Sequence, residues 1–197
     1  MTVTHWFGPN AGSKAKRSGH PVMFGKMKSA ELFDPFPEGG GYPHRFLPWA
    51  FEIMSEFGDT VEPDEVLHLC GGSVKTGITV DIRSEKNPTI VSDCRSVPLP
   101  DNSFQWILAD PPYSEEYARN LYGTEDCYPK PGEIVKEAAR LLKPGGLLGL
   151  LHFQVPMIRK PMKFVNVYGV TTGSGYNIRA WSLLQKMEVK LVEKDTQ

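Results

Sequence analysis

Short apolar runs that end in glycine or in an acidic residue are the feature that most limits the folds open to this chain. These runs cover residues 66–69, 78–80, 89–91 and 104–109. Runs of this length, bounded by turn-forming residues, are typical of buried β-strands. The polar residues that follow them are therefore expected at the carboxyl edge of a sheet, which is where open α/β sheets bind ligands.

The remainder of the chain alternates helices and strands in a way that defines the fold class. We expect helices over residues 46–57 and 133–142 and further strands over residues 147–153, 164–170 and 178–184. Lys143-Pro144-Gly145-Gly146 is a helix stop and should form the turn before the fifth strand. The last two strands are joined by a glycine-rich segment and are predicted to pair antiparallel. The sequence therefore predicts an α/β fold whose mostly parallel sheet includes one antiparallel strand.

The beginning of the chain differs in composition from the rest. Residues 1–45 are rich in Gly, Pro and Lys without clear periodicity, which predicts an irregular arm, and residues 46–197 are expected to form a single domain. Residues 1–28 contain five Lys or Arg and no Asp or Glu, although the net charge of the chain is -1. A basic arm with aromatic residues is suited to a phosphate backbone and to stacking on bases. A solvated tail has the same composition, so both interpretations stay open.

Cysteine usage and apolar stretches indicate where the protein works. The three cysteines are far apart and form no Cys-x-x-Cys pair, which argues against a disulfide framework and against a zinc site. No signal-peptide pattern is seen, and the longest apolar stretch, residues 145–153, is too short to span a membrane. We therefore expect a cytoplasmic protein without a metal and without a membrane partner.

Asp110-Pro111-Pro112-Tyr113 follows the fourth predicted strand directly. The two prolines lack N–H groups and fix φ, so they end the strand and stiffen the turn, while their carbonyls stay available as acceptors. A carboxylate, a carbonyl acceptor and an aromatic ring together suit a planar group that carries an NH2. A strand terminator with an Asp cap has the same sequence, so this interpretation depends on the placement of the motif at the ligand edge.

Other strand ends carry residues suited to a nucleotide-like ligand. Gly71 and Gly72 allow the backbone to approach a ligand closely. Asp81 is placed to accept from both ribose hydroxyls, and Asp93 is placed to accept from an adenine amine. A Gly-Gly turn and a strand-end Asp are also common without any ligand, so their order and common edge are the stronger indication.

These motifs resemble those of the class I S-adenosylmethionine-dependent methyltransferases, and specifically of the nucleic-acid amino-methyltransferases. The resemblance covers residues 42 to about 186 and implies a Rossmann-like fold with a mostly parallel seven-stranded sheet. Its motifs are residues 67–72 (the glycine-rich first motif), 80–82 (the acidic second), 91–94 (the third), 110–113 (the catalytic motif) and 142–146 (the turn before the fifth strand). Only eight residues separate Gly72 from Asp81, so the usual helix between the first two strands must shrink to a turn.

The resemblance also implies roles for individual residues, with S-adenosyl-L-methionine as cofactor. The implied cofactor-binding residues are Tyr42, His44, Arg45, Cys70, Gly71, Gly72, Asp81, Ile82, Asp93 and Cys94. The implied catalytic residues are Asp110, Pro111, Pro112 and Tyr113, and the implied substrate-binding residues are Tyr113, Tyr117 and Tyr122. His152, at the end of the fifth strand, is expected to be a buried, satisfied histidine and not a catalytic base.

The expected reaction is methylation of the exocyclic amine of a nucleic-acid base, with adenine in DNA favoured. In the related enzymes, those acting on protein glutamine usually carry Asn and those acting on cytosine more often carry Ser at the position of Asp110. RNA, a protein or small-molecule amine, and a catalytically silent subunit that presents nucleic acid remain alternatives. Since no insertion is large enough for a separate target-recognition domain, the arm, the loop over residues 114–131, a homodimer or a partner subunit would supply target recognition.

Overall fold

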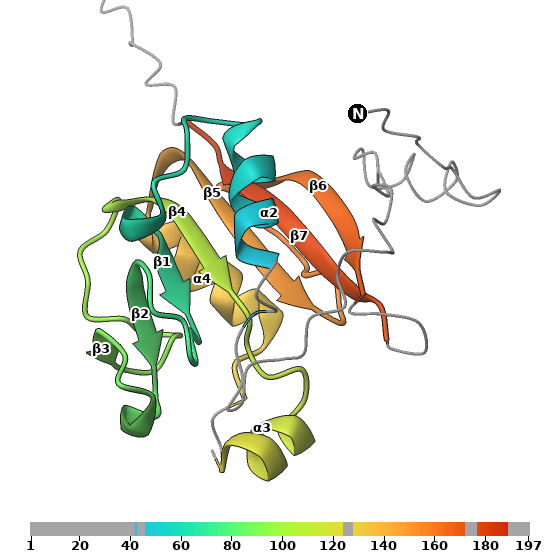
Figure 1. Ribbon diagram of the computed structural model, residues 1–197. Helices are drawn as coiled ribbons and strands as arrows, with labels where there is room; N and C mark the ends of the chain where they lie inside the picture. The colour runs from blue at the N-terminus through green and yellow to red at the C-terminus, as the bar shows by residue number, and fades with distance from the viewer. Residues whose placement is uncertain (1–41, 43–45, 124–127, 172–176, 189–197) are drawn as a thin grey trace, which may run out of the picture.

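The computed structural model describes Tyr42 and residues 46–123, 128–171 and 177–188, and these form a single seven-stranded sheet (Figure 1). The strands are β1 Leu67–Leu69, β2 Ile78–Asp81, β3 Ile90–Val91, β4 Phe104–Ala109, β5 Leu142–His152, β6 Met162–Val170 and β7 Arg179–Lys186. Their spatial order is β3-β2-β1-β4-β5-β7-β6. The first five strands run parallel, and β7 is antiparallel to both of its neighbours. The predicted fold class is therefore confirmed.

One helix packs on each face of the sheet. Helix α2, Phe46–Ser55, lies in front of the sheet in Figure 1, and helix α4, Pro131–Leu141, lies behind it. Successive residues of β4 alternate between the two cores because side chains along a strand point to opposite faces. Ile107 packs in the core beneath α4, whereas Trp106 packs in the core beneath α2.

The connections between the first strands are short, as predicted. The chain passes from β1 to β2 through turns and bends, without a helix, and from β2 to β3 through the 3-10 turn Ser84–Lys86. A second 3-10 turn, Pro63–Glu65, precedes β1. Within the ranges that the structure describes, no helix is long and apolar enough to cross a membrane.

Two local predictions were wrong. The segment after the catalytic motif, expected as a loop, contains helix α3, Glu115–Tyr122. The Ser114 hydroxyl caps its start by accepting from the Tyr117 amide, and Gly123 ends it in the left-handed region.

The second error concerns the start of β5. The segment 143–146 was expected to separate α4 from the strand, but β5 begins at Leu142, directly after the helix. The turn residues form an irregularity within the strand, since Phe104 pairs with Leu142 while Trp106 already pairs with Leu147. Gly145 has a φ of 83°, which a residue with a side chain rarely adopts.

Candidate active site

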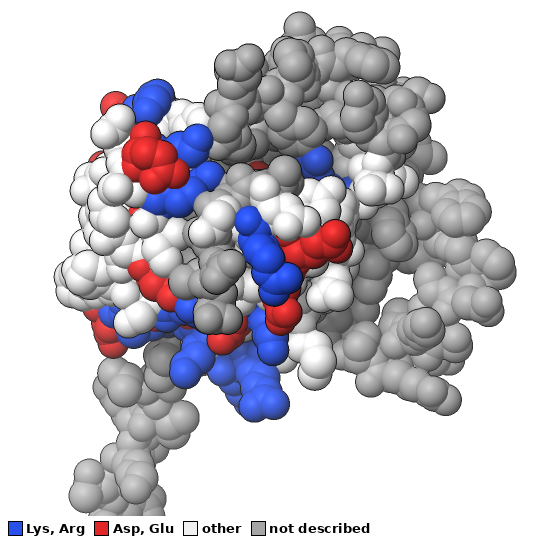
Figure 2. Space-filling view, turned by 90° about the horizontal axis from the view of Figure 1, so that it is seen from below, with Lys and Arg blue, Asp and Glu red and all other residues white. Residues whose placement is uncertain are grey.

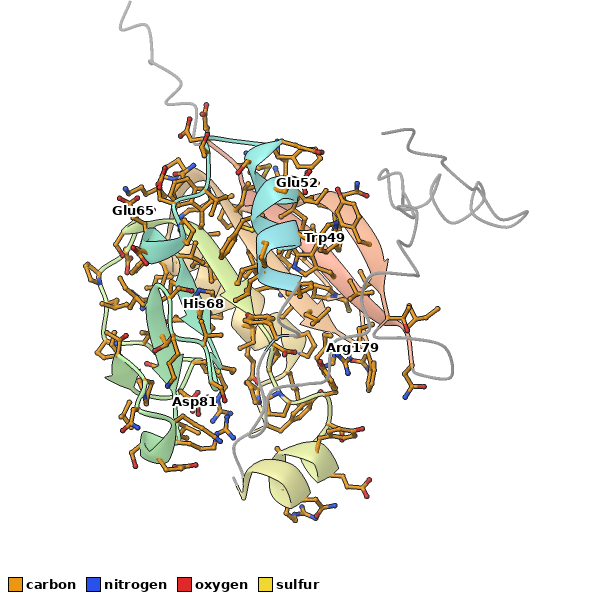
Figure 3. The ribbon with its side chains drawn as sticks, in the orientation of Figure 1. Trp49, Glu52, Glu65, His68, Asp81 and Arg179 are labelled. Atoms are coloured by element: carbon orange, nitrogen blue, oxygen red, sulfur yellow. The ribbon has the colours of Figure 1, made fainter. Side chains whose placement is uncertain are left out.

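The carboxyl ends of the parallel strands form the lower edge of the sheet in Figure 1. Asp81 ends β2 and Asp110 directly follows β4. Because β7 runs antiparallel, its beginning lies at the same edge, and Arg179 joins the site from there (Figure 3).

The carboxylate of Asp81 is fully engaged by two neighbouring residues. Its Oδ1 accepts from the amide and Nε of Arg83, and its Oδ2 accepts from the Gly72 amide and Arg83 Nη2, all at 3.0 Å. Burial pushes the pKa of Asp81 upward, but these hydrogen bonds and the charge of Arg83 outweigh it and lower the pKa. A carboxylate offers about four acceptor positions. Ribose hydroxyls can therefore bind Asp81 only after the Arg83 guanidinium has moved.

Removal of the Arg83 side chain is expected to strengthen cofactor binding. Arg83→Ala frees one acceptor position on each oxygen of Asp81, which is the number that two ribose hydroxyls need. A hydrogen bond to a charged group is worth about 1.5–3 kcal/mol, so calorimetry should show an affinity for S-adenosylmethionine higher by roughly tenfold. The exposed Arg159→Ala serves as the control. Weaker binding in Arg83→Ala would mean that the guanidinium itself contacts the cofactor.

The end of β3 repeats this arrangement in a more exposed setting. Arg95 binds Asp93 through its amide at 2.8 Å and through its guanidinium at 2.6 Å. These bonds lower the pKa of Asp93. At both strand ends, the arginine two residues after the aspartate thus binds the carboxylate that the sequence predicts as a cofactor acceptor.

Backbone conformation and close packing explain the small residues in the turn after β1. Cys70 and Gly72 have φ values of 57° and 55°. A Cβ on Gly71 would lie 3.2 Å from Cβ of Thr79, so close packing alone favours glycine there. The Cys70 thiol lies 3.1 Å from that of Cys94. This contact, with burial, raises the pKa of Cys70, so its thiol is neutral.

Buried polar atoms without a partner mark the space beside this turn. The Tyr42 hydroxyl and both ring nitrogens of His68 are buried and have no hydrogen-bond partner among the described residues. The rings of Tyr42 and His68 are 6.0 Å apart, and Tyr42 is close enough for the charge of Asp110 to raise its pKa, after burial as the main cause. Burial lowers the pKa of His68 to about 4, so the ring is neutral. Tyr42 and His68 thus offer neutral donors and acceptors, and Asp110 offers a carboxylate near them. This combination can bind a ligand that carries both an amine and a carboxylate.

Asp110 is a half-buried carboxyl group with one defined partner. Its amide donates to the Leu69 carbonyl, which ties the motif to β1, and its Oδ1 accepts from the Tyr113 hydroxyl at 2.8 Å. Burial raises the pKa of Asp110 to about 6, although the Tyr113 hydrogen bond and the charge of Arg179 oppose the rise. The carboxyl group is therefore mostly ionised at pH 7 and protonated in mild acid.

The Tyr113 ring is packed among aromatic and cationic neighbours. Its centroid lies 4.5 Å from that of Phe153, 5.6 Å from that of His152 and 6.0 Å from that of Tyr117. The guanidinium carbon of Arg179 lies 5.2 Å from the Tyr113 ring centroid. Tyr113 and Tyr117, both predicted as substrate-binding, are thus brought together.

His152 is buried as predicted, but only one of its nitrogens is satisfied. Nδ1 accepts from the Gln154 amide at 2.9 Å, so the neutral ring carries its proton on Nε2. Burial lowers the pKa of His152, and the Pro112 carbonyl is near enough to oppose that shift. Within the described part of the chain, Nε2 has no hydrogen-bond partner.

Charges on this side of the molecule are mixed, with a basic border. Figure 2 views the molecule from below and shows Lys and Arg side chains gathered on the side of α4. An open groove of about 650 Å³ lies between α4 and the segment that precedes β6, and its cationic residues are Lys136, Arg140, Arg159 and Lys160. Arg140 is committed to Glu137 and Asp101. In the described parts of the chain, no cluster of three His, Cys, Asp or Glu could hold a metal ion.

Comparison with known proteins gives the architecture a family context. No protein-family profile matches the chain. Demethylmenaquinone methyltransferase of Chlamydia trachomatis is 28% identical over 171 residues, covering 71% of this chain and 68% of that protein. A solved structure from Listeria monocytogenes, assigned to the class I S-adenosylmethionine-dependent methyltransferases, superposes with a TM-score of 0.52 at 16% identity, covering 78% of this chain and 62% of that one. This chain has the class I methyltransferase fold.

A further solved structure extends the comparison. TrmN from Thermus thermophilus superposes with a TM-score of 0.49 at 18% identity. The match covers 71% of this chain and 49% of TrmN, so this chain spans about half of TrmN. The class I methyltransferase fold and the curated relative together give S-adenosyl-L-methionine as the cofactor and methyl transfer as the reaction. The predicted fold and cofactor are confirmed.

The structure describes most of the predicted site residues but not all of them. Residues 1–41, His44, Arg45 and the side chain of Tyr122 lie outside the described part of the chain. Ile82 is exposed next to Asp81 and Cys94 is buried against Cys70. His68, Arg83 and Arg179 were not predicted. The antiparallel direction of β7 was the available signal for Arg179, because it brings the beginning of that strand to the cofactor edge.

Proposed function

We propose that this methyltransferase transfers a methyl group to the exocyclic amine of a nucleic-acid base, with adenine in DNA as the first candidate. The observation that carries the proposal is the Asp110 carboxyl group, which lies at the carboxyl edge of the parallel strands and accepts a hydrogen bond from the Tyr113 hydroxyl. The two prolines that follow Asp110 leave acceptors and remove donors at this point. Such a set suits a planar NH2 group better than a hydroxyl or a carbon nucleophile.

The cofactor would be held by the turn after β1 and by the ends of β2 and β3. Tyr42 and His68 offer unpaired polar atoms for its amino-acid end, and Asp81 and Asp93 offer acceptors for its nucleoside end once their arginines move. Bound S-adenosylmethionine supplies an electrophilic methyl group. The protein itself supplies position and a fixed field for the nucleophile.

The target amine would bind by exchange with Tyr113. Accepting both N–H groups, through the Asp110 carboxylate and the Pro111 carbonyl, draws the nitrogen toward tetrahedral geometry and exposes its lone pair. The Tyr113 hydroxyl takes one acceptor position of Asp110, on Oδ1, and in this proposal it leaves that position to the amine. The freed ring can then stack on the target base, which must leave a duplex to reach this edge.

Activity is expected to fall as the pH drops through about 6. The pKa of Asp110 lies there, and only the ionised carboxylate can accept from the amine and stabilise positive charge on it. The measurement is kcat/KM for the nucleic acid against pH, which reports the ionisation of groups in the free enzyme. Asp110→Asn, which cannot titrate, should lack this acid limb. If the same fall in activity at low pH persisted in Asp110→Asn, another group would be its cause.

An anionic substrate fits the basic border beside α4. Lys136, Arg159 and Lys160 line the open groove there and form no ion pair among the described residues. The predicted basic arm, outside the described residues, would add five cations. Binding to nucleic acid should therefore weaken steeply with salt.

Mass spectrometry of nucleosides from a host that expresses the protein tests the proposal most directly. A methylated adenine in DNA that is absent with Asp110→Ala would support it, and the same product only in RNA would move the substrate to RNA. The curated relative is a demethylmenaquinone methyltransferase, so a demethylated quinone is the second candidate. Methylation of that quinone, with DNA and RNA unmodified, would overturn the nucleic-acid proposal.

A further inference from the structure

Arg179 reaches the catalytic edge because of the direction of β7. Arg179 is the first residue of this strand and pairs with Val170, the last residue of β6. The next residue, Ala180, pairs with His152 at the end of β5. Arg179 is therefore held by strand pairing next to the segment that contacts Tyr113, and not by a loop.

The contacts of Tyr113 connect Arg179 to Asp110. The guanidinium carbon of Arg179 lies 5.2 Å from the Tyr113 ring centroid, within the range of a cation–π interaction. The hydroxyl of the same ring donates to Asp110 Oδ1 at 2.8 Å. The packing of Phe153 at 4.5 Å further restrains the ring. A planar guanidinium suits this position because it can stack on a ring, which an ammonium group does less well.

Charge at this place also depends on Arg179. Among the described groups, Tyr113 lowers the pKa of Asp110 through its hydrogen bond and Arg179 lowers it through its charge. The nearby Tyr42 and Cys70 are neutral at pH 7, because their pKa values are raised. Arg179 therefore supplies the positive charge that opposes the effect of burial on the carboxyl group. The nearby His152 is also neutral, because burial lowers its pKa.

We propose that Arg179 is a positioning residue for methyl transfer. It holds the Tyr113 ring in the place from which its hydroxyl orients the Asp110 carboxylate before the amine arrives, and from which the ring then stacks on the target base. This role rests on the proposed amine methylation. A phosphate-binding role for Arg179 is the competing explanation, and the two differ in the kinetic quantity that they change. Positioning changes kcat and its pH dependence, whereas phosphate binding changes KM for the nucleic acid and its salt dependence.

The test compares Arg179→Gln and Arg179→Lys with a control, Lys143→Gln, which removes an exposed cation at the start of β5, away from the carboxyl edge. The substrates are DNA and S-adenosylmethionine. For Arg179→Gln we expect kcat to fall by roughly one to two decades, by analogy with the loss of other preorganised groups, and the acid limb of the pH profile to move to higher pH. Arg179→Lys keeps the charge but not the planar group. Its acid limb should therefore stay close to the wild-type pH, while its kcat stays reduced. Lys143→Gln should leave both unchanged.

Two further measurements keep the test decisive. The carboxyl carbon of 13C-labelled Asp110, titrated by NMR without substrate, should show a higher midpoint in Arg179→Gln than in the wild type. In the double variant Tyr113→Phe, Arg179→Gln, the loss in activation free energy for kcat should be much smaller than the sum of the losses in the two single variants. The reason is that both residues act through one contact. A change in KM alone, or an unchanged Asp110 midpoint, would overturn the positioning role. A shifted midpoint with no methylation of DNA or RNA would overturn the proposed function and leave the Arg179–Asp110 coupling standing.

Discussion

Asp110→Ala is expected to lower methyl transfer by about two to three decades while cofactor affinity and melting temperature stay nearly unchanged, because it removes one preorganised electrostatic group. The fold should tolerate the change. The pKa of Asp110 is raised to about 6, so above that pH the ionised group is disfavoured in the folded state, and its removal relieves this effect. Labelled methyl incorporation into DNA, calorimetry and thermal unfolding measure the three quantities.

Two companion variants sharpen this prediction. Asp110→Asn keeps the shape and one acceptor but loses the charge, so its activity should be impaired and still measurable. Asp59→Ala removes an exposed carboxylate and should leave activity as it is. Full activity in Asp110→Ala would exclude the proposed mechanism, and a collapsed fold would assign the residue a structural role.

Gly149→Ala is expected to destabilise the protein by about 1–3 kcal/mol, which is typical of an overpacked core. A Cβ on Gly149 would lie 2.6 Å from Leu108 Cδ2 and 2.7 Å from Trp181 Nε1. Trp181 is fully buried, with its ring 5.0 Å from that of Trp49, so it has little room to move. Urea unfolding should show a lower midpoint at an unchanged m-value.

Gly132→Ala is the matched control for this substitution. Gly132 lies in the first turn of α4, and a Cβ there would meet nothing within 4 Å. Alanine favours a helix over glycine, so the free energy of unfolding should stay the same or rise slightly. Equal losses in the two variants would mean that the Trp181 contact is not the cause.

Periodicity and turn residues were sufficient to predict the sheet. Apolar runs such as residues 104–109 matched their strand because local pattern and burial agree there. Helix α3 was missed because its sequence is polar, and its existence depends on the Ser114 and Gly123 caps. The early start of β5 was missed because a Pro-Gly-Gly turn also suits an irregularity within a strand.

The site was predictable only where it depends on strand ends. Asp81 and Asp110 were found because they follow apolar runs. The hydrogen bonds that Arg83 and Tyr113 donate to these carboxylates were not predicted, because a sequence does not show which donors a carboxylate will bind. Arg179 contacts Tyr113 from 66 positions away in the chain, a separation that only the sheet pairing closes.

The hydrogen bond from Tyr113 to Asp110 has a consequence for the end of the catalytic cycle. Under the proposed reaction, the amine has one N–H fewer after methylation and can no longer donate to both acceptors. The Tyr113 hydroxyl, tethered three residues away, then competes for the carboxylate at a high effective concentration. The return of the tyrosine would expel the product and disfavour a second methylation. Tyr113→Phe should accordingly show stronger product inhibition and some dimethylated base.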